Sequence, residues 1–295
     1  MKERRLHSVI VVWYDPRKGE FEENIPLLWN GQRNLRRGSK NALTVVFLSG
    51  MTKLSPSYLT SLRSVGYTLV DAEPIYQEIA PRYPNLDHFG TYEKYCFIRW
   101  LVLKKLFPLG GIVQYDGDIV WNLQPEAIEK ILQGKTLMLP GGPSFAAISD
   151  RTWFNIYARE LTHFAKNPQT YGQDWRGSEF RTQIGSDQDL FDYLLQRKLL
   201  PQDTFPKSTS VFAENPLLLR DKLRADLAFW HMQTDYVHYL NLRYMLEPYG
   251  LSLFAPNPIN TPPVLLKGIY LLGRLARRSY QSRRSMCEYF LSQLH

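Results

Sequence analysis

The chain has 295 residues, of which 44% are hydrophobic and 22% charged, and its formal net charge is +8. This length and composition exclude a disordered chain and allow one large α/β domain, or one domain with a sizeable extension. The two cysteines, Cys96 and Cys287, lie too far apart in sequence for a paired-cysteine motif, so neither a disulfide scaffold nor a structural zinc site is expected.

Strand-like and helix-like stretches alternate in the first half of the chain. Apolar runs bounded by turn residues predict strands at 8–13, 43–48, 67–70, 111–115 and 136–139. Helical patterns with start and stop signals predict helices at 55–65, 91–107 and 123–133. The first apolar run is too short for a signal peptide or a membrane span, and no other stretch approaches ~20 apolar residues, so we expect nothing to cross a bilayer.

This alternation predicts a parallel or mixed sheet with helices on its faces. In such sheets, ligands bind beyond the carboxyl ends of the strands. Asp15, Asp71 and Asp116 each follow a predicted strand. We therefore expect these three carboxylates to face one crevice.

From residue 142 onward the sequence is more irregular and rich in Trp, Tyr, Pro and Gly. Two landmarks stand out in this part. One is the segment 185–189, which opens a predicted helix that continues to Leu195. The other is a strand-like segment at 229–232.

Positive charge is concentrated near the C-terminus. Between residues 265 and 295 there are six basic residues and one acidic residue, so this segment carries five of the eight net positive charges. A nucleic-acid-binding protein more typically has basic residues spread over one face of its domain, so we do not expect nucleic acid as a partner.

The central chemical feature is Asp116-Gly117-Asp118, directly after the predicted strand at 111–115. Two carboxylates one residue apart at the end of a buried strand can share a divalent cation, and Mg²⁺ or Mn²⁺ takes such oxygen ligands and completes its shell with phosphate oxygens. Gly117 lets a phosphate approach the backbone closely. The alternative interpretation is a turn with solvated carboxylates.

In this motif the sequence resembles the GT-A glycosyltransferases, and most closely bacterial sugar transferases of families 8 and 32. Arg99 in the preceding helix, the segment 186–189 and His231 occur in the order that the resemblance requires, over about residues 8–240. The resemblance implies a GT-A-like (Rossmann-like) α/β fold over 1–260, with a mixed, mostly parallel sheet flanked by helices. A basic helical extension would follow at 261–295.

The resemblance also implies roles for individual residues. The metal ligands would be Asp116, Asp118 and His231, and Arg99 would reach the donor diphosphate. Asp187, Gln188 and Asp189 would contact the transferred sugar, and the catalytic candidates are Asp187, Asp189 and Arg99. The alternative interpretations are a surface arginine for Arg99, a carboxylate favoured by the helix dipole for Asp187, and a structural histidine for His231.

Two donor-binding candidates, Tyr14 and Asp71, are inferred only from their positions at strand ends, for base stacking and nucleoside hydrogen bonds. The expected reaction moves a hexose from a nucleotide diphosphate sugar, with a UDP-sugar favoured, to a saccharide or lipid-linked acceptor in surface polysaccharide or glycan synthesis. We expect acceptor specificity in the region 142–181, with Trp153 and Trp175 as candidates. The expected location is the cytoplasm, including peripheral contact with the inner face of the membrane.

Two other functions fit parts of the sequence. A haloacid-dehalogenase-like phosphatase also uses a strand followed by Asp-x-Asp, with Asp116 as phosphoryl acceptor and Asp118 as acid and base. Alternatively, the basic C-terminal segment makes the chain a non-catalytic protein that binds membrane surfaces.

Overall fold

The computed structural model describes residues 6–14, 27, 31, 43–108, 111–117, 119–121, 124–138, 143–175, 183–201, 203–204, 212–214 and 229–231. For 119–121, 203–204, 212–214 and 229–231 it describes the backbone alone. Asp15, Asp118 and the predicted extension at 261–295 lie outside the described residues.

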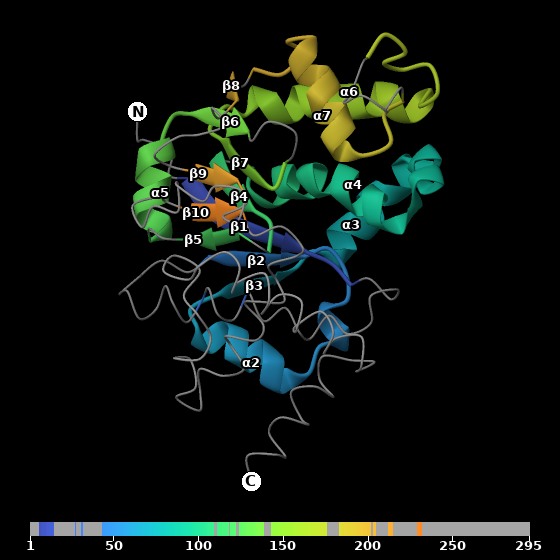
Figure 1. The fold of residues 1–295 in the computed structure, drawn as a ribbon. Coiled ribbons are helices and arrows are strands. Elements are labelled where there is room, and N and C mark those ends of the chain that lie inside the picture. Colours follow the sequence, from blue (N-terminus) through green and yellow to red (C-terminus); the bar gives the residue numbers. More distant parts are fainter. Residues whose placement is uncertain are drawn as a thin grey trace, which may run out of the picture.

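The main sheet of the described region has seven strands in the order β3-β2-β1-β4-β7-β6-β8 (Figure 1). Their bounds are β1 Leu6–Val12, β2 Thr44–Phe47, β3 Thr68–Asp71, β4 Gly111–Tyr115, β6 Thr136–Met138, β7 Phe145–Ile148 and β8 Asp203–Thr204. Strands β3, β2, β1 and β4 run parallel, and β7 runs antiparallel to both of its neighbours, β4 and β6. The sheet is therefore mixed and mostly parallel, as predicted.

A smaller sheet has the strand order β5-β10-β9, with β5 at Ile119–Trp121, β9 at Phe212–Glu214 and β10 at Phe229–His231. Strand β5 begins at Ile119, directly after the Asp-x-Asp motif. Its antiparallel register with β10 places His231 opposite Ile119. Two segments more than 100 residues apart in sequence thus meet beside the motif.

Helices cover both faces of the main sheet. The described helices are α2 Pro56–Ser64, α3 Glu73–Ile79, α4 Gly90–Leu106, α5 Pro125–Leu132, α6 Thr152–Lys166 and α7 Asp187–Gln196, and 3-10 turns occur at Met51–Lys53, Ala80–Arg82 and Pro84–Phe89. Side chains of β1 alternate between two cores because successive strand residues point to opposite faces. Val9 and Val11 pack with α3, α4, α6 and α7, whereas Ile10 and Val12 pack with α2 and α5.

Most of the predicted elements are confirmed, with bounds within two residues of those observed. The two ends of α2 show why residues close to a helix were enough to predict its bounds. Ser55 is its N-cap, and the side-chain oxygen of Ser55 accepts a hydrogen bond from the backbone N–H of Tyr58. Gly66, with φ of 93°, follows the helix in a conformation that favours glycine.

The region after residue 142 is more regular than we expected, because β7 and the fifteen-residue helix α6 lie within it. The acceptor roles suggested for Trp153 and Trp175 do not fit their positions, since both rings are buried. Trp153 stacks on Tyr157 and Phe191 at ring-centroid distances of 5.3 and 5.8 Å. Trp153 therefore belongs to the core that joins α6 to α7, and does not face an acceptor.

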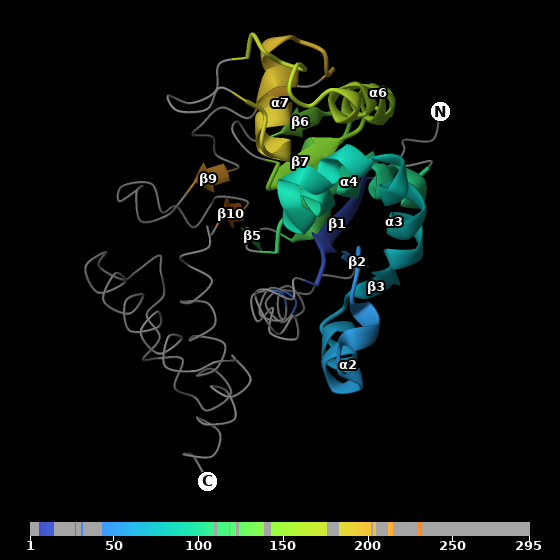
Figure 2. The same cartoon turned by 90° about the vertical axis from the view of Figure 1, so that its right-hand side faces the viewer.

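Helices α3, α4, α6 and α7 form a layer on one face of the main sheet, with α4 at its centre. Helix α4 lies against the sheet on one side and beside α3, α6 and α7 on the others (Figure 2). Among the helices in the described ranges, none combines the length and the apolar character that a membrane span requires.

Replacing Trp153 with alanine is expected to lower the free energy of unfolding by about 3–5 kcal/mol, because it leaves a large cavity between α6 and α7. The matched control is Ile131→Ala on α5, since Ile131 is 39% exposed. This control should change the free energy by only about 0.5 kcal/mol. Urea denaturation of the purified variants measures both values, and equal effects would contradict the core assignment of Trp153.

Candidate active site

Asp116 follows the last residue of β4 and lies at the edge where the parallel strands end. Its backbone N–H donates to the carbonyl oxygen of Ser144 at 2.7 Å, which fixes the chain direction after the strand. Nε2 of Gln114 donates to Oδ1 of Asp116 at 2.9 Å. The Asp116 side chain is 33% exposed, so one part of the carboxylate is held by the protein and another faces solvent.

Arg99 connects Asp116 to the start of α7. Its Nη1 donates to Oδ1 of Asp116 and its Nη2 donates to Oδ2 of Asp187, both at 3.0 Å. The side chain of Arg99 is 3% exposed, so the interpretation as a surface arginine is wrong. The guanidinium also lies 5.1 Å from the ring centre of Trp100. A buried cation between two carboxylates is the central electrostatic feature of the described region.

Local helix geometry positions Asp187. Ser186 is the N-cap of α7, and its Oγ accepts a hydrogen bond from the backbone N–H of Asp189 at 3.2 Å. Oδ2 of Asp189 in turn accepts from the backbone N–H of Gly185 at 3.0 Å. These two bonds resemble a capping box and give Asp189 a structural role. Gln188, between the two buried carboxylates, is exposed.

Burial and the neighbouring charges have opposite effects on the pKa values of Asp187 and Arg99. Burial raises the pKa of Asp187, and the neighbouring Arg99 cation offsets part of that rise. Burial alone lowers the pKa of Arg99, but Asp187 and Asp116 raise it above its ordinary value, so Arg99 stays protonated. The Nε of Arg99 has no hydrogen-bond partner among the described residues.

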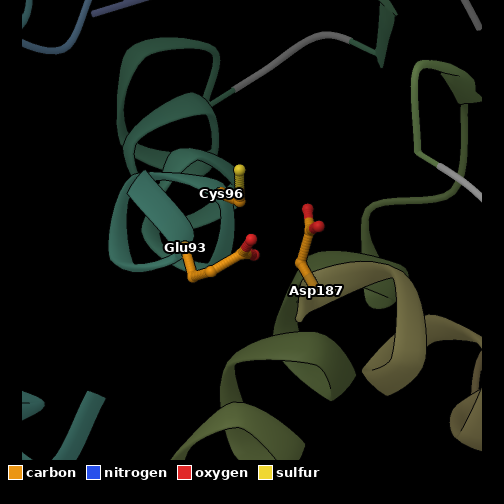
Figure 3. Close-up of side chains that lie close together, drawn as sticks. All are labelled: Glu93, Cys96 and Asp187. Carbon is orange, nitrogen blue, oxygen red and sulfur yellow. The ribbon is translucent and has the colours of Figure 1, made fainter. Parts of the chain in front are cut away.

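Two groups of residues could hold a metal. Glu93, Cys96 and Asp187 each offer a ligand atom, and these atoms lie within 4.8 Å of one another (Figure 3). Burial raises the pKa of the Cys96 thiol, which disfavours the thiolate that binds metals. The Asp187 side chain is only 4% exposed and is paired with Arg99, so a metal ion has little access to its oxygens. This group is therefore a poor metal site.

Asp116 fits a divalent cation better. No hydrogen bond to its Oδ2 occurs among the described residues, and the carboxylate is partly exposed at the sheet edge. A hard cation such as Mg²⁺ or Mn²⁺ prefers such an oxygen. The backbone register of β5 and β10 brings His231 beside Ile119, the residue after Asp118. The chemistry of Asp116 and this arrangement of the chain are compatible with the predicted ligand set.

The predicted nucleoside contacts lie along the same edge, at the ends of β1 and β3. The backbone N–H of Tyr14 donates to Oγ of Ser49, and Nζ of Lys53 lies 4.3 Å from the centre of the Tyr14 ring. Asp71 ends β3, is exposed, and accepts a hydrogen bond from the backbone N–H of Glu73. Neither residue contacts the Arg99 centre in a described interaction.

Sequence reasoning missed four polar groups near these candidates: Lys53, Glu93, Cys96 and Gln114. Helical spacing could have found Glu93 and Cys96, since they precede Arg99 by six and three residues on α4. Gln114 lies two residues before Asp116 in an otherwise apolar strand, where a polar residue is unusual. Lys53 carried no sequence signal.

No protein-family model matches the chain, and no curated protein is significantly similar to it. Solved structures do resemble it. Mouse xyloside xylosyltransferase 1, in its apo form, has a TM-score of 0.50 at 11% sequence identity, over 78% of this chain and 98% of that one. The chain thus shares the fold of a glycosyltransferase, which confirms the predicted GT-A-like α/β fold. Membership of family 8 or 32 stays a prediction.

Two further glycosyltransferases have lower TM-scores. The apo structure of bifunctional WbbM gives 0.45 at 10% identity, over 85% of this chain and 52% of that chain. A glycosyltransferase involved in glycosylating the major capsid of PBCV-1 gives 0.39 at 10% identity, over 81% of this chain and 99% of that chain.

Arg99→Met is expected to destabilise the metal-free protein by about 3–5 kcal/mol near pH 7.5, because it leaves the Asp187 carboxylate buried without its cation. The deficit should shrink as pH falls. Burial raises the pKa of Asp187 and Arg99 lowers it, so this pKa rises further in Arg99→Met. The variant's added loss of stability is therefore absent below the unfolded pKa and appears as pH rises through the folded values. Urea denaturation near pH 5 and near pH 7.5, with EDTA, measures the difference.

The matched control for this measurement is Arg99→Met combined with Asp187→Asn. A neutral amide at position 187 removes the buried charge, so the double variant should lose the pH dependence. A deficit of Arg99→Met that is the same at both pH values would contradict this account of the centre.

Proposed function

We propose that this chain is a metal-dependent glycosyltransferase that moves a hexose from a nucleotide diphosphate sugar to an acceptor hydroxyl. The observation that carries the proposal is the Arg99 bridge, which joins Asp116 at the end of β4 to Asp187 at the start of α7. The fold shared with a xylosyltransferase supports it. Such a centre contains a cation and carboxylates at the position where the fold binds ligands.

The diphosphate of the donor would bind to a metal ion held by Asp116 and Asp118, and Arg99 would add positive charge beside it. Asp116, Asp118 and His231 would hold Mn²⁺ or Mg²⁺, which supplies positive charge to the departing diphosphate. Arg99 contributes a second positive charge from the protein itself. Its guanidinium is held in place by two hydrogen bonds before any substrate arrives, so little reorganisation is needed during the reaction.

The transferred sugar would lie beside the start of α7, where Asp187, Gln188 and Asp189 are neighbours. Asp189 is engaged in the helix cap and would position the loop that ends at Gly185. Gln188 is exposed and takes no part in the helix-cap hydrogen bonds described above, and it would contact sugar hydroxyls. The nucleoside would bind toward Tyr14 and Asp71, and the neighbouring Lys53 adds a cation there.

We further propose a UDP-sugar donor and a saccharide or lipid-linked acceptor, in the synthesis of surface polysaccharide or glycan. The basic segment at 261–295 would contact anionic headgroups on the inner face of the membrane, and the enzyme would act in the cytoplasm. The phosphatase alternative and the non-catalytic alternative gain no support from the fold comparison.

Asp116→Asn is expected to abolish metal-dependent nucleotide binding, because it removes the charged oxygen that a hard cation needs. With UDP and Mn²⁺ at about 100 times the dissociation constant, the wild-type melting temperature should rise by on the order of 5 °C. The rise should vanish in EDTA and in Asp116→Asn. Differential scanning fluorimetry with UDP, GDP and CDP measures it and identifies the base.

The matched control is Asp87→Asn, whose carboxylate is 66% exposed and pairs with Lys94 away from the Arg99 centre. This variant should keep the full rise. If no nucleotide raised the melting temperature of the wild type, or if Asp116→Asn behaved like Asp87→Asn, the proposed function would be wrong.

A further inference from the structure

Four aromatic side chains form a group at the N-terminal end of α4, which we call the aromatic platform: Trp13, Tyr76, Tyr92 and Tyr95. The ring of Trp13 lies 5.3 Å from that of Tyr92, edge to face, and 5.6 Å from that of Tyr95, stacked. Tyr76 supports Tyr95 from α3 at 4.6 Å. Tyr92 is 38% exposed, whereas the other three rings are packed against the core. Tyr92 is therefore the most exposed member of the platform, and the other three rings support it from the core side.

The platform adjoins the Arg99 centre. Tyr92, Cys96 and Arg99 are spaced by four and three residues, so they share one face of α4. Seven residues of helix span about 10 Å, and the side chain of Arg99 leans back toward the N-terminus of the helix. A ligand at Arg99 would thus have Tyr92 as a neighbour.

The side chains of Trp13 and Tyr14, which follow β1, contact different residues. Trp13 packs toward α3 and α4, whereas the next residue, Tyr14, packs against Gly50 and Lys53. Successive residues of an extended chain point to opposite sides. If the nucleoside of the donor binds beside Tyr14, the platform remains available for the acceptor, which lies on the other side of the transferred sugar.

A pyranose ring has the chemistry that suits this surface. Its C–H groups form an apolar face that stacks on an aromatic ring. Rigid aromatic rings lose little conformational entropy on binding.

We propose that Tyr92, supported by Trp13, forms an acceptor subsite that stacks on the apolar face of an uncharged pyranose. The proposal rests on the proposed function, because the transferred sugar at Asp187 defines the position of its neighbour. Tyr92 is a binding residue in this view, and no bond is made or broken at its side chain.

Saturation-transfer difference NMR on the full chain tests the subsite. The probes are the methyl pyranosides of glucose, galactose, mannose and xylose, with uridine as a base probe, each with UDP and Mn²⁺ absent and present. At least one glycoside should bind the wild type. Its affinity should fall roughly fivefold to tenfold in Tyr92→Ala, because a stacking ring is lost. It should stay within about twofold in Tyr92→Phe, which keeps the ring.

The matched control is Ile131→Ala, which removes the other large exposed hydrophobic side chain of the described residues and should leave glycoside binding unchanged. Glycoside binding that Tyr92→Ala leaves intact, or no glycoside binding at all, would overturn the subsite. Uridine signals that disappear in Tyr92→Ala would overturn it too, since the platform would then hold a base.

The nucleotide melting shift, measured on the same samples, separates the two hypotheses. A shift with UDP and Mn²⁺ but no Tyr92-dependent glycoside binding refutes the acceptor subsite and leaves the transferase standing. Tyr92-dependent glycoside binding without any nucleotide shift refutes the transferase, and the acceptor assignment falls with it, although Tyr92 would remain a sugar-binding residue.

Discussion

The arrangement of this site depends on one buried cation. Arg99 cannot sit almost fully buried on α4 unless its charge is balanced, because desolvating an unpaired guanidinium costs several kcal/mol. Asp116 and Asp187 supply that balance with one hydrogen bond each. Since one carboxylate ends a strand and the other begins a helix, the pairing holds the sheet edge and α7 in a fixed relation.

Strand β1 lies between β2 and β4, and the two residues that follow it contact different elements. Strands β2 and β4 flank β1, and their parallel register brings the carboxyl ends of all three to one edge. The ring of Trp13 packs against aromatic residues of α4, whereas the ring of Tyr14 lies beside Lys53. The two aromatic residues that follow β1 therefore contact different elements.

The likeness to a xylosyltransferase at 11% identity establishes the fold and nothing finer. Folds of this kind serve many reactions, so function has to be argued from the site. The site contains a partly exposed carboxylate at a strand end, a buried arginine and a capped helix that begins with two more carboxylates. The cysteine and carboxylates beside them, although close enough to suggest a metal, are better explained by packing and by the pairing of Asp187 with Arg99.

Local patterns in the sequence determined the secondary structure wherever a single segment carries the signal. The apolar run before Asp116 predicted β4, and Ser55 predicted the start of α2, because strand burial and helix caps depend on neighbouring residues. The tertiary structure alone decided that Trp153 is core and that Arg99 pairs with Asp187, which lies 88 residues away. Contacts at such separations depend on how helices pack across the sheet, and no local pattern encodes that packing.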